Sequence, residues 1–157
     1  MDRDEFARTG QSDDLRPLTS KGRGEMEAIA RRISAEIESL DVLATSSLVR
    51  AVQTAEIVAA ACGMGAPQIT TSLLPEAPLD EFEKWCAELG AKGIVAVVGH
   101  EPHLGSLVTW LMTGRRESRV RLRKGGACLL EFESEARRDS GTLSWLLTPR
   151  QLAMGSR

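Results

Sequence analysis

The sequence predicts an α/β fold with a mostly parallel central sheet, helices on both faces of that sheet and antiparallel strands near the C-terminus. Two observations support this fold class. Up to residue 114, segments with helical periodicity alternate with short, continuous apolar runs, which is typical of a parallel sheet covered by helices. After that point, strand-like runs follow one another with no helical pattern between them, which indicates antiparallel pairing.

A long amphipathic helix and a short strand are predicted first. The residues from 21 to 40 carry an apolar stripe at helical spacing, and Thr19 or Ser20 can cap the start of the helix. The apolar run in DVLATS, residues 41–46, is too short for a helix. The serine that could cap a helix comes only at its end, where the next segment begins. The run therefore predicts a buried strand.

A second helix and a weaker strand follow. The segment 46–62 again places its apolar residues on one face, and either Ser46 or Ser47 can cap its N-terminus. The run QITTS, residues 68–72, predicts only a weak strand. The order strand, helix, strand continues the parallel pattern.

The clearest strand of the sequence is GIVAVVG, residues 93–99, because its apolar run is continuous and bounded by glycines. It is flanked by two predicted helices. The segment 78–90 ends at a glycine, and the segment 102–114 has Pro102 near its start and Gly114 just past its end.

The last third of the chain supplies the predicted antiparallel strands, at residues 119–123, 126–133 and 141–148. In the first of them, Arg119, Arg121 and Arg123 alternate along one face. They could meet an acidic partner. The plainer interpretation is a solvated edge strand whose apolar residues turn inward.

Composition bounds the function. The chain has 157 residues, enough for one domain with a sizeable core, and Lys+Arg 20 against Asp+Glu 22 leaves no basic surface of the kind that binds nucleic acid. The charged N-terminus carries no signal peptide, no apolar run is long enough to span a membrane, and three separated cysteines indicate free thiols. We expect a cytoplasmic protein with neither a nucleic acid nor a membrane as its partner.

Two predicted turns at the carboxyl ends of strands hold the candidate site. Ser46 and Arg50 lie where the first strand leads into a helix, and His100 lies where the strand 93–99 does so. Helix N-termini attract anions, a guanidinium pairs well with a phosphoryl group, and an imidazole can donate a hydrogen bond or shuttle a proton. Alone, Arg50 could be a surface arginine and His100 a strand-end histidine. Their joint placement favours a phosphate site.

Five segments in order resemble the histidine phosphatase superfamily, in its small phosphohistidine phosphatase branch: RPLTSKGRGEM, TSSLVRAVQTAEI, VVGHEPHLG, LRKGGACLLEF and LSWLLTPRQL. The resemblance implies one histidine-phosphatase-like domain over residues 1–157, with a phosphoglycerate mutase-like three-layer sandwich. It also implies that Arg50 clamps the phosphoryl group and that His100 hydrogen-bonds it. Ser46 would lie at the same phosphate.

One expected motif is not in the sequence. Members of the family begin with a strand ending in Arg-His-Gly or Arg-His-Ala, whose histidine is the nucleophile, and the residues after Met1 resemble the loop that follows it. We expect about ten further residues, a strand and a short lead, ahead of Met1. Alternatively, the chain binds phosphorylated ligands without turnover, or His103 replaces the nucleophile. Against the last reading, His103 should lie on the helix surface, pointing away from the pocket.

The resemblance implies hydrolysis of phosphohistidine on a protein, such as a phosphotransfer domain, through a phosphohistidine enzyme intermediate. Larger members of the family protonate an alkoxide leaving group with a carboxylic acid, and Glu76 is the nearest candidate by position. The plainer interpretation of Glu76 is a solvated loop carboxylate. The short chain leaves no room for a lid domain, which suits a protein substrate. A small phosphomonoesterase is a further alternative.

Neither a metal nor another cofactor is expected. The two histidines of HEPH are too closely spaced for a helical zinc pair, and Pro102 lies between them. The sequence also lacks the glycine patterns of nucleotide-binding loops. No cysteine is followed by an arginine six positions later, so the loop of the cysteine phosphatases is absent as well.

Overall fold

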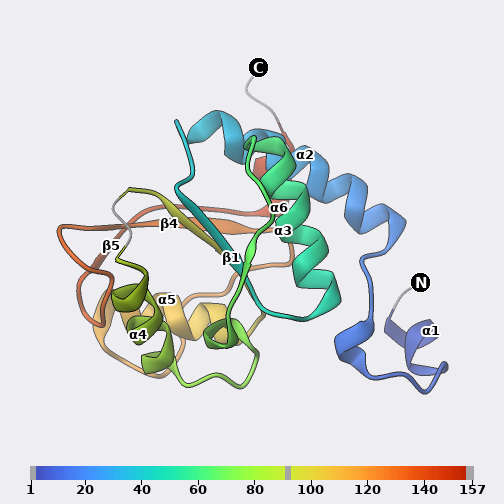
Figure 1. Ribbon diagram of the computed structural model, residues 1–157, viewed down its shortest axis with the longest axis horizontal. Helices are drawn as coiled ribbons and strands as arrows, with labels where there is room; N and C mark the ends of the chain where they lie inside the picture. Colours follow the sequence, from blue (N-terminus) through green and yellow to red (C-terminus); the bar gives the residue numbers. More distant parts are fainter. Residues whose placement is uncertain (1–2, 91–92, 155–157) are drawn as a thin grey trace.

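The computed structural model of the protein describes residues 3–90 and 93–154 (Figure 1). Helices and strands alternate as the sequence predicts. In chain order, the elements are α1 (Arg3–Ala7), the 3-10 turn η1 (Asp13–Leu15), α2 (Ser20–Glu36), β1 (Val42–Thr45), α3 (Val49–Ala61), β2 (Gln68–Ile69), the 3-10 turn η2 (Thr71–Leu73), α4 (Leu79–Leu89), β3 (Val95–Val98), α5 (His103–Thr113), β4 (Ala127–Phe132), β5 (Gly141–Leu147) and α6 (Pro149–Ala153).

The central sheet is parallel, with β1 in the middle and β2 and β3 on either side of it. Leu43 of β1 faces Ala96 of β3 in the register, and Ala44 faces Val97. Three of the four residues of β1 are buried, as expected for a strand that is paired on both edges and covered on both faces.

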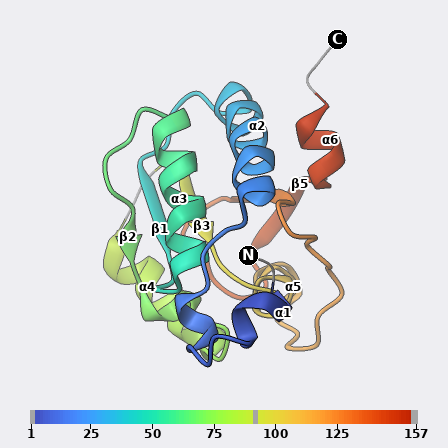
Figure 2. The same cartoon turned by 90° about the vertical axis from the view of Figure 1, so that its right-hand side faces the viewer.

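Helices cover both faces of this sheet, as predicted. Because successive side chains of a strand point to opposite faces, Leu43 and Ala44 belong to two different cores. Leu43 packs with residues of α2 and α3, such as Ile29 and Val58. Ala44 packs on the other side, with Phe82 of α4 and other residues of α4 and α5. Figure 2 shows α2 and α3 together on one side and α4 and α5 on the other.

The antiparallel part is a hairpin of β4 and β5, and it forms a separate two-stranded sheet. Both cores nevertheless contain residues from β3 and β4. Ala96 and Ala127 pack against the first core, and Val97 and Leu130 against the second. The hairpin therefore continues the middle layer of the protein next to β3.

An edge of β3 and an edge of β4 are left open between these two sheets. Within residues 3–90 and 93–154, no strand pairs with β3 other than β1, and none pairs with β4 other than β5. All four residues of β3 are only half-buried, although helices cover both faces of the sheet. Within the described residues, β3 and β4 are therefore neighbours in the middle layer that are not paired with each other.

This arrangement corrects one expectation from the resemblance. Because the family's first strand lies inside the sheet, the resemblance implies that without it both 42–45 and 94–98 have unpaired backbone groups. That is wrong for the former, because β1 pairs with β2 on one edge and with β3 on the other. The open edges belong to β3 and to the hairpin.

The predicted strand at 119–123 is also wrong. Leu122 is buried between two exposed arginines, so the alternation exists, but the segment is not a strand. Its backbone is satisfied by side chains instead: the Arg119 amide donates to Thr109 Oγ1 at 2.9 Å, and the Val120 carbonyl accepts from Ser118 Oγ at 2.8 Å. The segment runs over α5 and not along the sheet.

Two further boundaries differ because short polar side chains bond to nearby backbone. The predicted strand 68–72 stops at Ile69, since Thr70 caps η2 through the Ser72 amide. The predicted cap of α3 is wrong as well. The N-cap is Leu48, without a side-chain hydrogen bond in the described structure, because Ser46 is engaged elsewhere.

Candidate active site

Three loops meet at one edge of the parallel sheet. Strands β1, β2 and β3 run in the same direction, so the residues that follow them lie at the same edge. Ser46 follows β1, Thr70 follows β2 and donates its amide to the Thr45 carbonyl at 2.9 Å, and His100 lies two residues beyond β3. This edge is where the sequence placed the candidate site.

His100 and Ser46 are brought into direct contact. Ser46 is fully buried, and its Oγ lies 2.6 Å from Nε2 of His100. Which of the two atoms donates depends on the tautomer of the imidazole. The His100 carbonyl accepts from the Leu104 amide at 2.7 Å, so the start of α5 fixes the backbone at this position.

His100 is neutral at pH 7. Burial, followed by the positive charge of Arg50 and a smaller electrostatic effect of His103, lowers the pKa of His100 to about 4, while Asp14 and Asp13 act weakly in the opposite direction. A neutral imidazole offers one donor and one acceptor. A bound anion would favour the protonated form and so raise this pKa.

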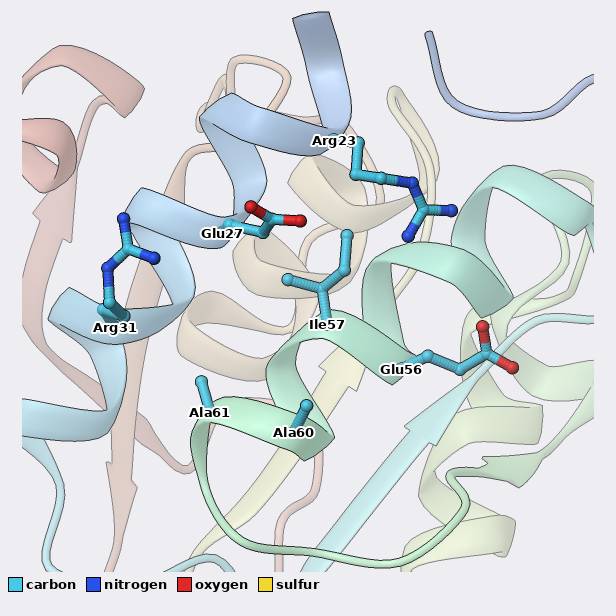
Figure 3. A pocket seen from close by; sticks show the side chains of 7 residues that line it. All are labelled: Arg23, Glu27, Arg31, Glu56, Ile57, Ala60 and Ala61. Atoms are coloured by element: carbon cyan, nitrogen blue, oxygen red, sulfur yellow. The ribbon is translucent and has the colours of Figure 1, made fainter. Parts of the chain in front are cut away.

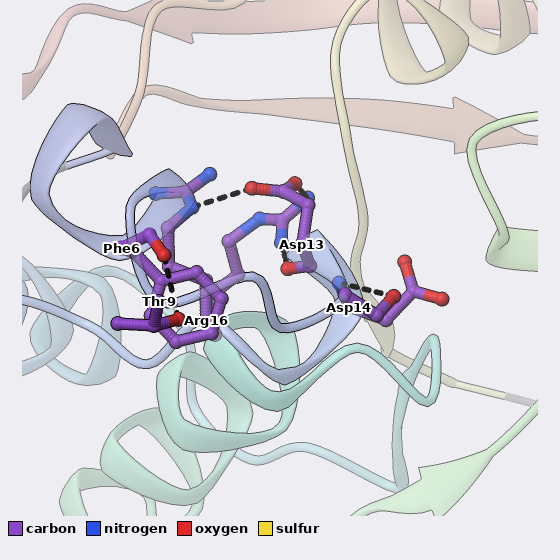
Figure 4. A network of polar contacts seen from close by, with 7 residues as sticks. Phe6, Thr9, Asp13, Asp14 and Arg16 are labelled. Carbon is purple, nitrogen blue, oxygen red and sulfur yellow. Dashed lines mark hydrogen bonds and ion pairs between the residues drawn. The ribbon is translucent and has the colours of Figure 1, made fainter.

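Arg50 lies in the first turn of α3 and is held by the loop that contains η1. Its Nη1 donates to the Asp13 carbonyl at 2.8 Å, and its Nη2 lies 3.2 Å from Asp13 Oδ2. Arg16 donates from Nε to the other oxygen, Asp13 Oδ1, at 2.7 Å. Figure 4 shows this carboxylate between two guanidinium groups.

Asp13 and the two arginines that contact it influence one another's pKa values. The hydrogen bond from Arg16, together with the charge of Arg50, lowers the pKa of Asp13, so its carboxylate is ionised at neutral pH. Burial lowers the pKa of Arg50, and Asp13 opposes that effect. With its side chain 22% exposed, Arg50 is screened but open to solvent. Asp13 therefore occupies two donor groups of the arginine predicted to hold phosphate, one through its backbone carbonyl and one through its carboxylate.

Two of these residues were not predicted from the sequence. Asp13 and Arg16 precede the first long helix, in a stretch where charged residues are common and no periodicity marks them. The available signal was the spacing of DDLR, since Asp13 and Arg16 at positions i and i+3 of a 3-10 turn lie on one side. That pattern says nothing about a contact with Arg50.

The loop after η2 carries Glu76, which is exposed. The neighbouring residue, Ala77, is held from α5: its carbonyl oxygen lies 3.1 Å from Nε2 of His103. The expectation that His103 lies on the helix surface is wrong, because its side chain is only 5% exposed. The start of α5 is therefore buried on a face that the sequence pattern assigned to solvent.

Glu101, next to His100, stabilises the start of α5. Its Oε1 accepts from the Gly105 amide at 2.7 Å, which satisfies a donor that the first helical turn leaves free. The described residues contain no group of three or more histidine, cysteine or acidic side chains that could hold a metal ion. In the same part of the chain, no helix has the length and apolar character to cross a membrane.

A groove lies away from this edge, between the outer faces of α2 and α3 (Figure 3). It has a volume of about 480 Å³. Side chains of both charges line it, including Arg23 and Glu27 from α2 and Glu56 from α3. A groove with mixed charge does not favour anions in particular.

The sequence over residues 5–92 matches the histidine phosphatase superfamily (branch 1). The chain belongs to this superfamily. Across 129 residues it is 36% identical to an uncharacterized protein of Picosynechococcus sp., over 80% of this chain and 74% of the relative.

Solved structures agree with the fold expected for a histidine phosphatase. The protein histidine phosphatase SixA, complexed with tungstate, superposes with a TM-score of 0.77 at 23% identity, over 90% of this chain and 89% of SixA. A phosphoserine phosphatase mutant of Entamoeba histolytica, complexed with phosphoserine, gives a TM-score of 0.66 at 15% identity, over 94% and 93% of the two chains. This member of the superfamily has the phosphoglycerate mutase-like fold.

Proposed function

We propose that this histidine phosphatase hydrolyses N-phosphohistidine on a protein, such as a phosphotransfer domain, with Arg50, His100 and Ser46 holding the phosphoryl group. The observation that carries the proposal is the convergence of residues after β1 and β3: His100 contacts Ser46, and the charge of Arg50 is close enough to lower the pKa of His100. The likeness to SixA, named as a protein histidine phosphatase, supports phosphohistidine as the substrate class.

The nucleophile would be a histidine on a strand that fills the gap between β3 and β4. The open edges of these two strands support that placement, because one inserted strand would pair with both and join the two sheets. The end of such a strand would lie near His100 if it ran parallel to β3.

The reaction then has two steps. A neutral imidazole of that histidine attacks phosphorus in line, the bond from phosphorus to the substrate nitrogen breaks, and the leaving imidazole takes up a proton. Water next attacks phosphorus, the bond to the enzyme histidine breaks and inorganic phosphate leaves. Arg50 and His100 stabilise the charge on the equatorial oxygens during both steps. Arg50 must exchange its bonds to Asp13 for bonds to phosphate.

A direct test uses a phosphohistidine peptide and a phosphoserine peptide of the same sequence. Phosphate release is measured with this chain and with a chain that also contains the residues encoded upstream of Met1. The Arg50→Gln variant of each chain is the control. We expect release only from the extended chain, only from phosphohistidine, and at least 100-fold slower after Arg50→Gln, given the usual worth of one transition-state donor. Release by the unextended chain contradicts the missing nucleophile.

A phosphate-binding module without turnover is the second candidate. It is favoured by the bonding of both histidines, because Nε2 of His100 is engaged with Ser46 and Nε2 of His103 with the Ala77 carbonyl, so neither of these nitrogens is free to attack phosphorus. In that case both chains bind the phosphohistidine peptide and neither releases phosphate. Preferential release from phosphoserine would instead indicate a small phosphomonoesterase with Glu76 as its acid.

A further inference from the structure

The second histidine of the HEPH motif is buried and performs no step of the proposed reaction. The side chain of His103 is 5% exposed and lies at the first residue of α5, three positions after His100. Burying an imidazole is unfavourable unless its polar atoms are satisfied. The bonding of His103 therefore indicates what the side chain is for.

Only one of the two ring nitrogens of His103 has a partner. Nε2 lies 3.1 Å from the Ala77 carbonyl oxygen, which can only accept, so Nε2 carries the hydrogen and donates it. Nδ1 is buried without a hydrogen-bond partner among residues 3–90 and 93–154. Burial lowers the pKa of His103, and the hydrogen bond to Ala77 opposes that effect, so burial favours the neutral ring.

The bond joins two loops of the candidate site. Ala77 lies between η2 and α4, in the segment that follows the carboxyl end of β2. His103 follows the loop that leaves β3. The Ala77 amide donates to the Leu74 carbonyl at 3.0 Å, so this segment is a tight turn with Glu76 inside it. The exposed Glu76 carboxyl group projects from a turn whose next peptide is tied to α5.

We propose that His103 is a positioning residue: its Nε2–H holds the Ala77 carbonyl and thereby fixes the turn that presents Glu76 beside the phosphate site. This inference rests on the proposed function, since Glu76 matters only if a leaving group is protonated there. His103 itself does not touch the substrate.

A role in packing alone does not account for the observed bonding. For filling space, an apolar side chain of similar size would be better, because it would leave no buried nitrogen without a partner. What leucine cannot supply is the donor to Ala77. Replacing His103 by Leu therefore separates packing from positioning, and His103→Gln is the matched control because its amide nitrogen reaches about as far as Nε2.

The first measurement is hydrogen exchange at the Ala77 amide in the wild type, His103→Leu and His103→Gln. We expect exchange to be at least tenfold faster in His103→Leu, with the amides of β1 unchanged and the thermal midpoint no lower than that of the wild type. His103→Gln should restore the slow exchange. Equal exchange in all three proteins overturns the inference, and it does so whether or not the protein hydrolyses phosphate.

The second measurement separates leaving groups in the extended chain. The phosphohistidine peptide releases an imidazole that takes up a proton, whereas p-nitrophenyl phosphate releases a phenolate that needs none. We expect His103→Leu to lower kcat at least tenfold for the former and less than twofold for the latter, and to have no further effect in a Glu76→Gln background. An equal loss for both substrates overturns the link to Glu76. Failure of the wild type to release phosphate counts against the proposed function only, and hydrogen exchange then decides the inference.

Discussion

The guanidinium of Arg50 in the candidate site already has hydrogen-bonding partners within the protein. Nη1 and Nη2 both bond to Asp13, which a phosphoryl group would have to replace or share. A charged hydrogen bond is worth about 1.5–3 kcal/mol, which corresponds to roughly a tenfold to 100-fold change in affinity.

Arg50→Gln should therefore weaken the binding of inorganic phosphate by about 10- to 100-fold in calorimetric titrations. Arg121→Gln is the matched control, because Arg121 is exposed and lies in the segment that runs over α5. It should change the affinity by less than about twofold. An equal loss in both variants would mean that phosphate responds to total charge and not to this site.

His100 predicts a pH dependence of stability. Its pKa is about 4 in the folded protein against an ordinary value of 6.5, so between these values the unfolded chain binds a proton that the folded chain does not. The free energy of unfolding must then decrease as pH falls from 6.5 towards 4. The shift corresponds to about 3 kcal/mol, and partial exposure reduces the expected loss to about 1–2 kcal/mol.

Chemical denaturation at a series of pH values measures this effect. His100→Gln should flatten the dependence between pH 6.5 and pH 4, because glutamine does not titrate. The pKa of His103 is also lowered, so His103→Gln should remove a separate part of the slope. If the stability of His100→Gln falls over this range as steeply as that of the wild type, the depressed pKa of His100 is contradicted.

Among the elements, two helical glycines give opposite predictions for the same substitution. A Cβ on Gly105 of α5 would collide with the Val120 carbonyl and lie 3.0 Å from Ser118 Oγ, where the segment crosses the helix. A Cβ on Gly24 of α2 would meet nothing within 4 Å. Alanine favours a helix over glycine by about 1 kcal/mol where there is space.

Gly24→Ala should therefore stabilise the protein by about 0.5–1 kcal/mol, and Gly105→Ala should destabilise it by about 1–3 kcal/mol because the segment must move away. Urea denaturation of both variants measures the difference. Stabilisation by Gly105→Ala would show that the segment from Ser118 to Val120 is not packed against α5.

The elements also show what sequence patterns can and cannot predict. Periodicity located α2, α4 and β3, because burial of one face is a local property of the sequence. It failed at residues 119–123, where alternation is real but the backbone bonds to Thr109 and Ser118 instead of a strand. The sequence could predict that Ser46 and His100 lie close together, because both follow strands of a parallel sheet. It could not predict the contact between Asp13 and Arg50, since no local pattern indicates which loop folds over a site.

At the scale of the whole molecule, the open edges of β3 and β4 are the main departure from a continuous middle layer. The residues of both strands are mostly half-buried, and both cores extend along both strands. Unpaired backbone groups in a covered layer are unfavourable, and they offer pairing to any extended segment. One strand inserted there would turn two small sheets into one.

Extending the chain at its N-terminus with a strand that ends in the family's Arg-His-Gly motif should fill that position. We expect the amides of β3 and β4 to exchange at least tenfold more slowly in the extended protein, and the thermal midpoint to rise by at least about 5 °C, because a central strand adds pairing on both edges. The same extension with two prolines in the strand is the control, since proline cannot donate to the ladder. Unchanged exchange at β3 and β4 alongside a higher midpoint would show that the extension packs elsewhere, and the gap would then not be the position of the nucleophile.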